Sequence, residues 1–179
     1  MARLYAWDRG LDYERARREL LKIVRDREAK GVRGLTRRAY AAVLLIQLTN
    51  GLRVAEACEA ALKWASTGGR EVKVRVLKRK DVYERLVVIP KELGGEERRL
   101  VAALSGEDPK RLAAKVKVFC KRALGYNTHA LRYAFITHLA RRGYPAQLIA
   151  KLTGHRKLDY ILHYTEKAAA EDVLRALLT

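Results

Sequence analysis

The segment from Glu71 to Pro90, EVKVRVLKRKDVYERLVVIP, constrains the fold more than any other part of the chain. Val72, Val74 and Val76 alternate with polar residues, which is the period of a strand with one buried face. After a charged stretch, Leu86 to Ile89 is apolar and rich in β-branched residues. The segment therefore predicts one antiparallel hairpin with a basic turn.

Apolar residues at helical spacing dominate the rest of the chain, and Gly31 and the Asn50-Gly51 pair are natural helix terminators within it. The helices expected from this pattern are at residues 12–30, 36–49, 53–64, 96–104, 109–124, 129–142 and 145–154, followed by one around Tyr160 and Tyr164 and a last one at 168–178. Together with the hairpin they predict an α+β fold that is mainly α, with a small antiparallel sheet.

The helix expected at 129–142 carries candidate site residues. Thr128 is suited to be its N-cap, since a hydroxyl there can accept from an unpaired backbone N–H group. Leu131, Phe135 and Leu139 recur at helical spacing and are expected to form its buried stripe. A chain of 179 residues is long enough to bury one core of ordinary size.

A net charge of +18 makes nucleic acid the leading partner. The 38 Lys and Arg outnumber the 20 Asp and Glu and are spread along the chain without a single basic tail. A nucleic-acid duplex carries one phosphate charge per roughly 1.7 Å of axis and releases counterions to such a surface. Charge alone also fits a ribosomal-type protein or simple solubility, so a candidate site has to decide between these classes.

Cysteine usage and hydropathy predict a soluble cytoplasmic protein. Cys58 and Cys120 are too few for a disulfide framework, and no Cys or His cluster has metal-ligand spacing. The N-terminus lacks the apolar stretch of a signal peptide, and the longest apolar run, 40–49, is too short to span a membrane. The scarcity of Asn, Gln and Met resembles the composition of thermophile proteins, including archaeal ones.

Two short stretches have the chemistry of a phosphate site. His129 and Arg132 are three residues apart in the first turn of an expected helix, where unpaired backbone N–H groups already favour an anion. Arg53 also follows a helix break, with Glu56 one turn later to orient it or to cap the helix. Two guanidinium groups can bind the non-bridging oxygens of one phosphodiester in a bidentate manner.

These motifs resemble those of the tyrosine recombinases, also called lambda-type integrases. TNGLRVAEA is similar to the family's first-arginine box, and the basic hairpin, HALR, LTGH and HYT follow in the family's order. His155 follows Arg132 by 23 positions and Tyr164 follows His155 by 9, as in Xer-type members. Because several short motifs agree in order and interval, the chain is identified as similar to Xer-type and archaeal viral integrases.

The resemblance implies a role for each matching residue. Tyr164 would attack the scissile phosphate and remain joined to it as a 3′-phosphotyrosine, and Glu56 matches the acidic residue beside the first arginine. The residues that would hold the phosphate and stabilise its transition state are Arg53, His129, Arg132 and His155. Exchange of one phosphodiester for another is nearly isoenergetic, so we expect neither a metal nor another cofactor.

Two assignments stay open within this resemblance. A hairpin lysine would protonate the departing 5′-oxygen; Lys80 is favoured by its spacing from ERLV, and Lys78 is the alternative. The lysine without this role is expected, like Arg79, to contact DNA phosphates. Tyr160 and Tyr164 are four residues apart on one helical face, so periodicity cannot choose between them, although the HYT motif favours Tyr164.

The resemblance also implies binding partners, and it implies which part of a full-length member the chain corresponds to. The expected partner is double-stranded DNA, with tetramers assembling on paired sites, while the isolated domain can be monomeric in solution. Residues 1–179 would form a catalytic domain, without the N-terminal core-binding domain that full-length members carry. Two rival functions remain, a type IB topoisomerase that reseals the original strand and a non-catalytic DNA-binding module.

Overall fold

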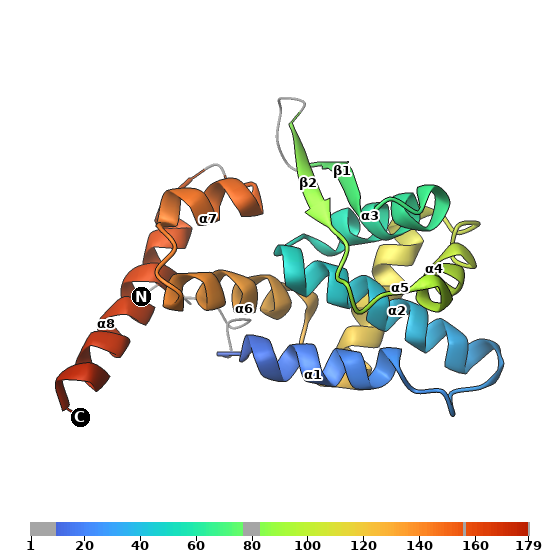
Figure 1. Ribbon diagram of the computed structural model, residues 1–179, viewed down its shortest axis with the longest axis horizontal. Helices are drawn as coiled ribbons and strands as arrows, with labels where there is room; N and C mark the ends of the chain where they lie inside the picture. Colours follow the sequence, from blue (N-terminus) through green and yellow to red (C-terminus); the bar gives the residue numbers. More distant parts are fainter. Residues whose placement is uncertain (1–9, 77–82, 156, 179) are drawn as a thin grey trace.

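A computed structural model describes residues 10–76, 83–155 and 157–178 of the chain (Figure 1). The elements are, in order, α1 (Tyr13–Val24), α2 (Gly31–Asn50), α3 (Val54–Thr67), β1 (Glu71–Arg75), β2 (Glu84–Val88), α4 (Gly95–Ala102), α5 (Pro109–Leu124), α6 (Thr128–Arg141), α7 (Ala146–Thr153) and α8 (Asp159–Leu178). This confirms the prediction of a mainly helical fold with a small antiparallel sheet.

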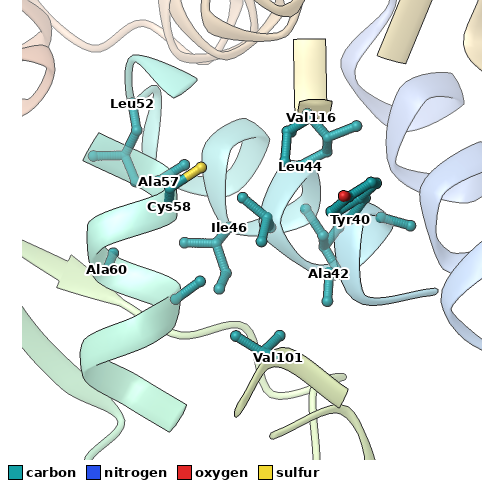
Figure 2. Close-up of a cluster of buried hydrophobic side chains, with 14 of the residues drawn as sticks. Tyr40, Ala42, Leu44, Ile46, Leu52, Ala57, Cys58, Ala60, Val101 and Val116 are labelled. Atoms are coloured by element: carbon teal, nitrogen blue, oxygen red, sulfur yellow. The ribbon is translucent and has the colours of Figure 1, made fainter. Parts of the chain in front are cut away.

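Helix α2 is the centre of the main core. Every residue of α2 from Arg38 to Leu48 is buried, because α1, α3, α4, α5 and α6 all pack against it. A helix enclosed on all sides has no polar face, which explains its nearly continuous apolar sequence. Figure 2 shows Leu44 and Ile46 of α2 lying in one cluster with Ala57 of α3, Val101 of α4 and Val116 of α5.

The hairpin confirms the expected antiparallel pairing. Glu71 pairs with Val88 and Arg75 with Glu84, and alternate residues of each strand are buried. Of the apolar run after the turn, Val87 and Ile89 are buried, whereas Leu86 and Val88 face outward with about half of their surface exposed. Arg85 is two residues before Val87 and lies on the same buried face of β2.

A second, smaller cluster lies beside the main core. It joins Ile136 of α6 to Ile149 of α7 and Ile161 of α8. Helix α6 contributes to both clusters, since its Leu131 and Ala134 belong to the main core. In Figure 1, α7 and α8 lie at one end of the molecule, and α6 runs between them and the remaining helices.

Three helix boundaries differ from the sequence-based expectation. Helix α1 ends at Val24 and not at Lys30, because the Asp26 carboxylate accepts from the Glu28 amide in a turn before α2. Gly31, expected to terminate a helix, is instead the first residue of α2. The two helices expected after residue 158 are one continuous helix, α8, because no glycine or proline interrupts it.

Helix α6 also differs in detail from the expectation. Its N-cap is Asn127, whose side chain accepts from the Ala130 amide at 3.1 Å, so Thr128 already lies in the helix. Leu131 is buried as expected, but Phe135 and Leu139 are only partly covered. The reason is that α6 packs against two clusters on different sides, so its buried residues do not form one stripe.

Within the described residues, no single helix is both long and apolar enough to cross a membrane. Helices α2 and α3 together reach the required length and composition, but a bend of 112° separates them. Most of their apolar side chains belong to the main core.

Candidate active site

The turn between α2 and α3 organises the site. Three consecutive carbonyl groups in it each accept from a different element: Asn50 from Arg85 of β2, Gly51 from Arg132 of α6, and Leu52 from Gln47 of α2. Gly51 is left-handed, with a φ of 61°, and a Cβ atom there would collide with the ring of Phe135. The turn can therefore approach α6 closely only because residue 51 is glycine.

Arg53 and Glu56 form a buried ion pair at the start of α3. Arg53 is the N-cap residue, and Glu56 accepts both from its backbone amide, at 3.1 Å, and from its Nη1, at 3.0 Å. The Glu56 side chain is fully buried, whereas 23% of the Arg53 side chain is exposed. The carboxylate thus orients a guanidinium group that still reaches the surface, and it also caps the helix, as the sequence led us to expect.

Arg132 is buried and joins three segments. Its Nη1 donates to the Gly51 carbonyl at 2.6 Å, and its Nη2 donates to the Thr153 carbonyl at 2.8 Å. Burial and the charge of Arg53 lower the pKa of Arg132 to about 9, with Glu56 acting in the opposite sense. The group therefore keeps its charge at neutral pH, inside a site that water does not reach freely.

His155 lies against Arg132, just after the end of α7. The Thr153 hydroxyl donates to the Ile149 carbonyl at 2.7 Å, and its oxygen lies 2.6 Å from Nδ1 of His155. Nη2 of Arg132 can only donate, and it lies 3.2 Å from Nδ1 and 3.3 Å from Nε2 of the same ring. Burial and the charges of Arg132, Arg53 and Arg85 lower the pKa of His155 to about 3, so the ring is neutral at neutral pH.

The base of the hairpin approaches the same site. Gly154, left-handed with a φ of 69°, leaves no room for a Cβ atom against Val76, which follows β1. The Val76 amide donates to the Tyr83 carbonyl at 2.8 Å and so closes the hairpin beyond the strands. A hollow of about 350 Å³ lies here, lined by Tyr83, Gln147, Ala150, Lys151, Gly154, His155 and Leu158.

Arg85 is a buried residue of this site that the sequence-based reasoning missed. It projects from β2, is 7% exposed, and its Nη2 donates to the Asn50 carbonyl. Its Nη1 lies 4.0 Å from Oε2 of Glu56. Burial lowers the pKa of Arg85 to about 10, an effect that Glu56 opposes. The signal was available, since Arg85 occupies an inward position of a strand whose other inward residues are apolar.

Comparison with known proteins decides the family. A model of the phage integrase family matches residues 103–171. The predicted integrase ORF241 of Acidianus two-tailed virus is 34% identical over 171 residues, which cover 96% of this chain and 68% of that protein. The chain belongs to the phage integrase, or tyrosine recombinase, family. XerD of Ralstonia nicotianae is 30% identical to this chain over 158 residues, 76% of the chain and 50% of XerD.

Solved recombinases have the same fold as this chain. XerH bound to a palindromic difH substrate matches with a TM-score of 0.61 at 17% identity, over 93% of this chain and 52% of XerH. XerA recombinase matches with a TM-score of 0.54 at 18% identity, over 91% of this chain and 62% of XerA. The chain thus spans between about half and two thirds of these recombinases.

The structure brings together only part of the predicted catalytic set within the described residues. Arg53, Arg132 and His155 meet around the α2–α3 turn, while His129 is exposed in the first turn of α6. Lys78, Arg79 and Lys80 lie outside the described residues. The backbone of Tyr164 lies in α8, and its side chain is not among the described ones. The catalytic roles of these residues therefore stay predictions.

In the described part of the chain, no three His, Cys, Asp or Glu side chains lie together in a way that could hold a metal ion. Cys58 and Cys120 are both free and buried, and burial raises the pKa of each thiol to about 12. Neither thiol is available as a nucleophile at neutral pH.

Proposed function

We propose that this chain is the catalytic domain of a site-specific DNA recombinase that cleaves and rejoins strands through a 3′-phosphotyrosine intermediate. The observation that carries the proposal is the convergence of Arg53, Arg132 and His155 on one turn, in a site with excess positive charge. Family membership supports the reaction class. The net charge of +18 supports double-stranded DNA as the partner, and so does the DNA-bound state of the related XerH.

In the proposed reaction the guanidinium groups of Arg53 and Arg132 hold the non-bridging oxygens of one phosphodiester, with His129 as a further donor. The phenolic oxygen of Tyr164 attacks phosphorus, and the bond between phosphorus and the 5′-oxygen breaks. The neutral ring of His155 accepts the phenol proton, and Lys80 gives a proton to the departing oxygen. Reversal with a second 5′-hydroxyl rejoins the strands, with no net consumption of energy.

His155 can serve this proton transfer because its surroundings change when DNA binds. In the free protein burial and the neighbouring cations hold its pKa near 3. A phosphate between those cations offsets their charge, and negative charge that builds up in the transition state offsets it further. Both effects raise the pKa of His155 at the moment when it must accept a proton.

The covalent intermediate provides the decisive test. We would incubate the protein with nicked duplexes of randomised sequence, which trap the cleaved strand because the short fragment diffuses away, and separate the products on a denaturing gel. The expected product is a slowly migrating protein–DNA band that Tyr164→Phe abolishes and Tyr160→Phe retains. Absence of the band from all duplexes, or its persistence in Tyr164→Phe, would contradict the proposal.

The phosphate-binding role of Arg132 has its own quantitative expectation. Removal of one preorganised donor costs about 3 kcal/mol of transition-state stabilisation, or about a hundredfold in rate. Arg132→Ala should reduce single-turnover cleavage by at least that factor. Because Arg132 also binds two main-chain carbonyls, the folding of this variant must be checked by circular dichroism; Arg132→Lys keeps the charge and separates the two effects.

The same DNA assays separate the rival functions. Relaxation of supercoiled plasmid without strand exchange would identify a type IB topoisomerase activity. DNA binding that yields no covalent product, and that is unaffected by Tyr164→Phe, would identify a non-catalytic module.

Self-association on DNA is part of the proposal. Val173, Leu174 and Leu177 of α8 are exposed by 57%, 58% and 75%, and Figure 1 shows this helix at the edge of the molecule. A palindromic substrate such as that of XerH presents two equivalent half-sites, which suit two copies of a protein. We infer that the end of α8 packs against another protomer when paired sites assemble into a tetramer.

A further inference from the structure

We propose that Arg85 is a positioning residue of the active site. It compensates the charge of Glu56 and anchors the α2–α3 turn, so that Arg53 acts on the DNA phosphate with its full positive charge. This inference rests on the proposed function, because it assigns a role toward the scissile phosphate. It concerns a residue outside the set expected from the family motifs.

The first observation is how firmly β2 holds the turn. Arg85 donates to the carbonyl of Asn50, while the Asn50 side chain donates to the Val88 carbonyl at 2.9 Å and accepts from the Val88 amide at 3.0 Å. Asn50 is thus bound to β2 through both its main chain and its side chain. Arg53 is only three residues after Asn50, so the position of β2 affects where the Arg53 guanidinium lies.

The second observation is the charge balance of the site. Three guanidinium groups, those of Arg53, Arg85 and Arg132, surround the carboxylate of Glu56, which gives a net charge of +2. Without Arg85, the buried carboxylate would be shared between the two phosphate-binding arginines alone, and the net charge would fall to +1. A phosphodiester is an anion and gains charge in its transition state, so the larger excess is the better match.

The third observation is that the fold satisfies the Arg85 side chain only in part. Its Nε and Nη1 atoms are buried and have no hydrogen-bond partner among the described residues. A buried donor without a partner is unfavourable for the stability of the fold. A strand that nevertheless carries a partly unpaired arginine beside a phosphate site indicates a functional reason for the charge.

Arg85→Met tests the inference, with Arg75→Met as the matched control. Arg75 is exposed on β1 of the same hairpin, and both variants lose one positive charge. Arg85→Met should reduce single-turnover cleavage of nicked DNA about tenfold or more relative to Arg75→Met. Because Arg85→Met also loses the hydrogen bond to the Asn50 carbonyl, circular dichroism must first show that both variants are folded. Equal cleavage by the two variants would overturn the inference.

A second measurement does not depend on cleavage. Titration with inorganic phosphate, followed through the imidazole resonances of His155, reports the charge of the site directly. Arg85→Met should weaken phosphate binding several-fold relative to Arg75→Met, whereas Arg85→Lys should retain most of it. If wild-type protein forms no covalent adduct but this difference is found, the proposed function fails and the role of Arg85 stands.

Two further outcomes keep the test decisive. If Arg85→Met does not fold, Arg85→Gln removes the same charge and keeps a donor for the Asn50 carbonyl, and the same comparisons apply. If Arg85→Lys binds phosphate as weakly as the neutral variants, charge compensation is refuted.

Discussion

At the scale of single residues, the site combines groups whose protonation states are set by burial. Arg132 and Arg85 remain charged although burial lowers the pKa of each, and His155 remains neutral because burial and three neighbouring arginines lower its pKa. The Thr153 hydroxyl and Nη2 of Arg132 contact its ring nitrogens. Burial and three guanidinium groups thus keep a neutral imidazole in the site, which can accept a proton.

The lowered pKa of His155 predicts an acid-sensitive fold. The pKa of the ring is about 3 in the folded protein and about 6.5 in the unfolded chain, so the unfolded chain binds more protons between these values. The free energy of unfolding should therefore fall as the pH drops below 6.5, by about 2 kcal/mol between pH 7 and pH 5. Urea unfolding at several pH values measures this slope.

His155→Gln should remove most of this pH dependence, whereas the same change at His163, which is exposed on α8, should leave it in place. A slope that is the same in both variants would show that other groups cause the acid sensitivity. The comparison is between slopes, so a change in the absolute stability of either variant does not affect it.

At the scale of elements, the turn between α2 and α3 does more than join two helices. Its carbonyl groups accept hydrogen bonds from β2, from α6 and from the end of α2. These three elements therefore meet at residues 50–52. The position of Arg53 depends on all of them. The geometry of the site is therefore a property of this junction and not of any one helix.

Gly51→Ala should damage the junction selectively. The substitution strains a left-handed residue and drives a methyl group into Phe135, so we expect a loss of about 2–4 kcal/mol in the free energy of unfolding. Gly125→Ala is the control, because Gly125 has a φ of 80° and open space around its Cβ position. It should lose only about 1 kcal/mol. Equal losses in chemical denaturation would contradict the close packing at Gly51.

Most elements could be predicted from the sequence because their signals are local. The two-residue period identified the hairpin, and glycine or proline residues at their ends identified α5 and α7. The end of α1 could not be found because a side-chain turn at Asp26, and not a glycine, stops it. The inward position of Arg85 could be predicted from the alternation of β2, but its approach to Glu56 could not, because tertiary packing decides which elements the hairpin meets.

At the scale of the whole molecule, the exposed end of α8 is the surface that we propose contacts another protomer. Isolated apolar side chains are common on protein surfaces, but Val173, Leu174 and Leu177 follow one another along one helix. This surface would be covered when protomers meet on DNA. We therefore expect the interaction to appear only when DNA raises the local concentration of the protein.

Leu174→Asp should weaken assembly on a two-site duplex without affecting the covalent attack on a single nicked site. The carboxylate would have to be buried in the proposed contact, which is unfavourable without a partner. Val32→Asp, at an 85% exposed position of α2, introduces the same charge elsewhere and should assemble normally. Mobility shifts with one-site and two-site duplexes measure the difference, and identical two-site complexes for both variants would contradict the role of α8.

The presence of two apolar clusters joined by α6 has a consequence for how the molecule unfolds. The part that carries Tyr164 has its own small interior, and the Arg132 side chain links it to the larger one through Thr153 on one side and Gly51 on the other. Denaturation need not then be a single cooperative event, since the smaller interior can open while the larger one stays closed. Opening of the smaller interior would break the hydrogen bond from Arg132 to Thr153, while α6 kept its packing on the larger one.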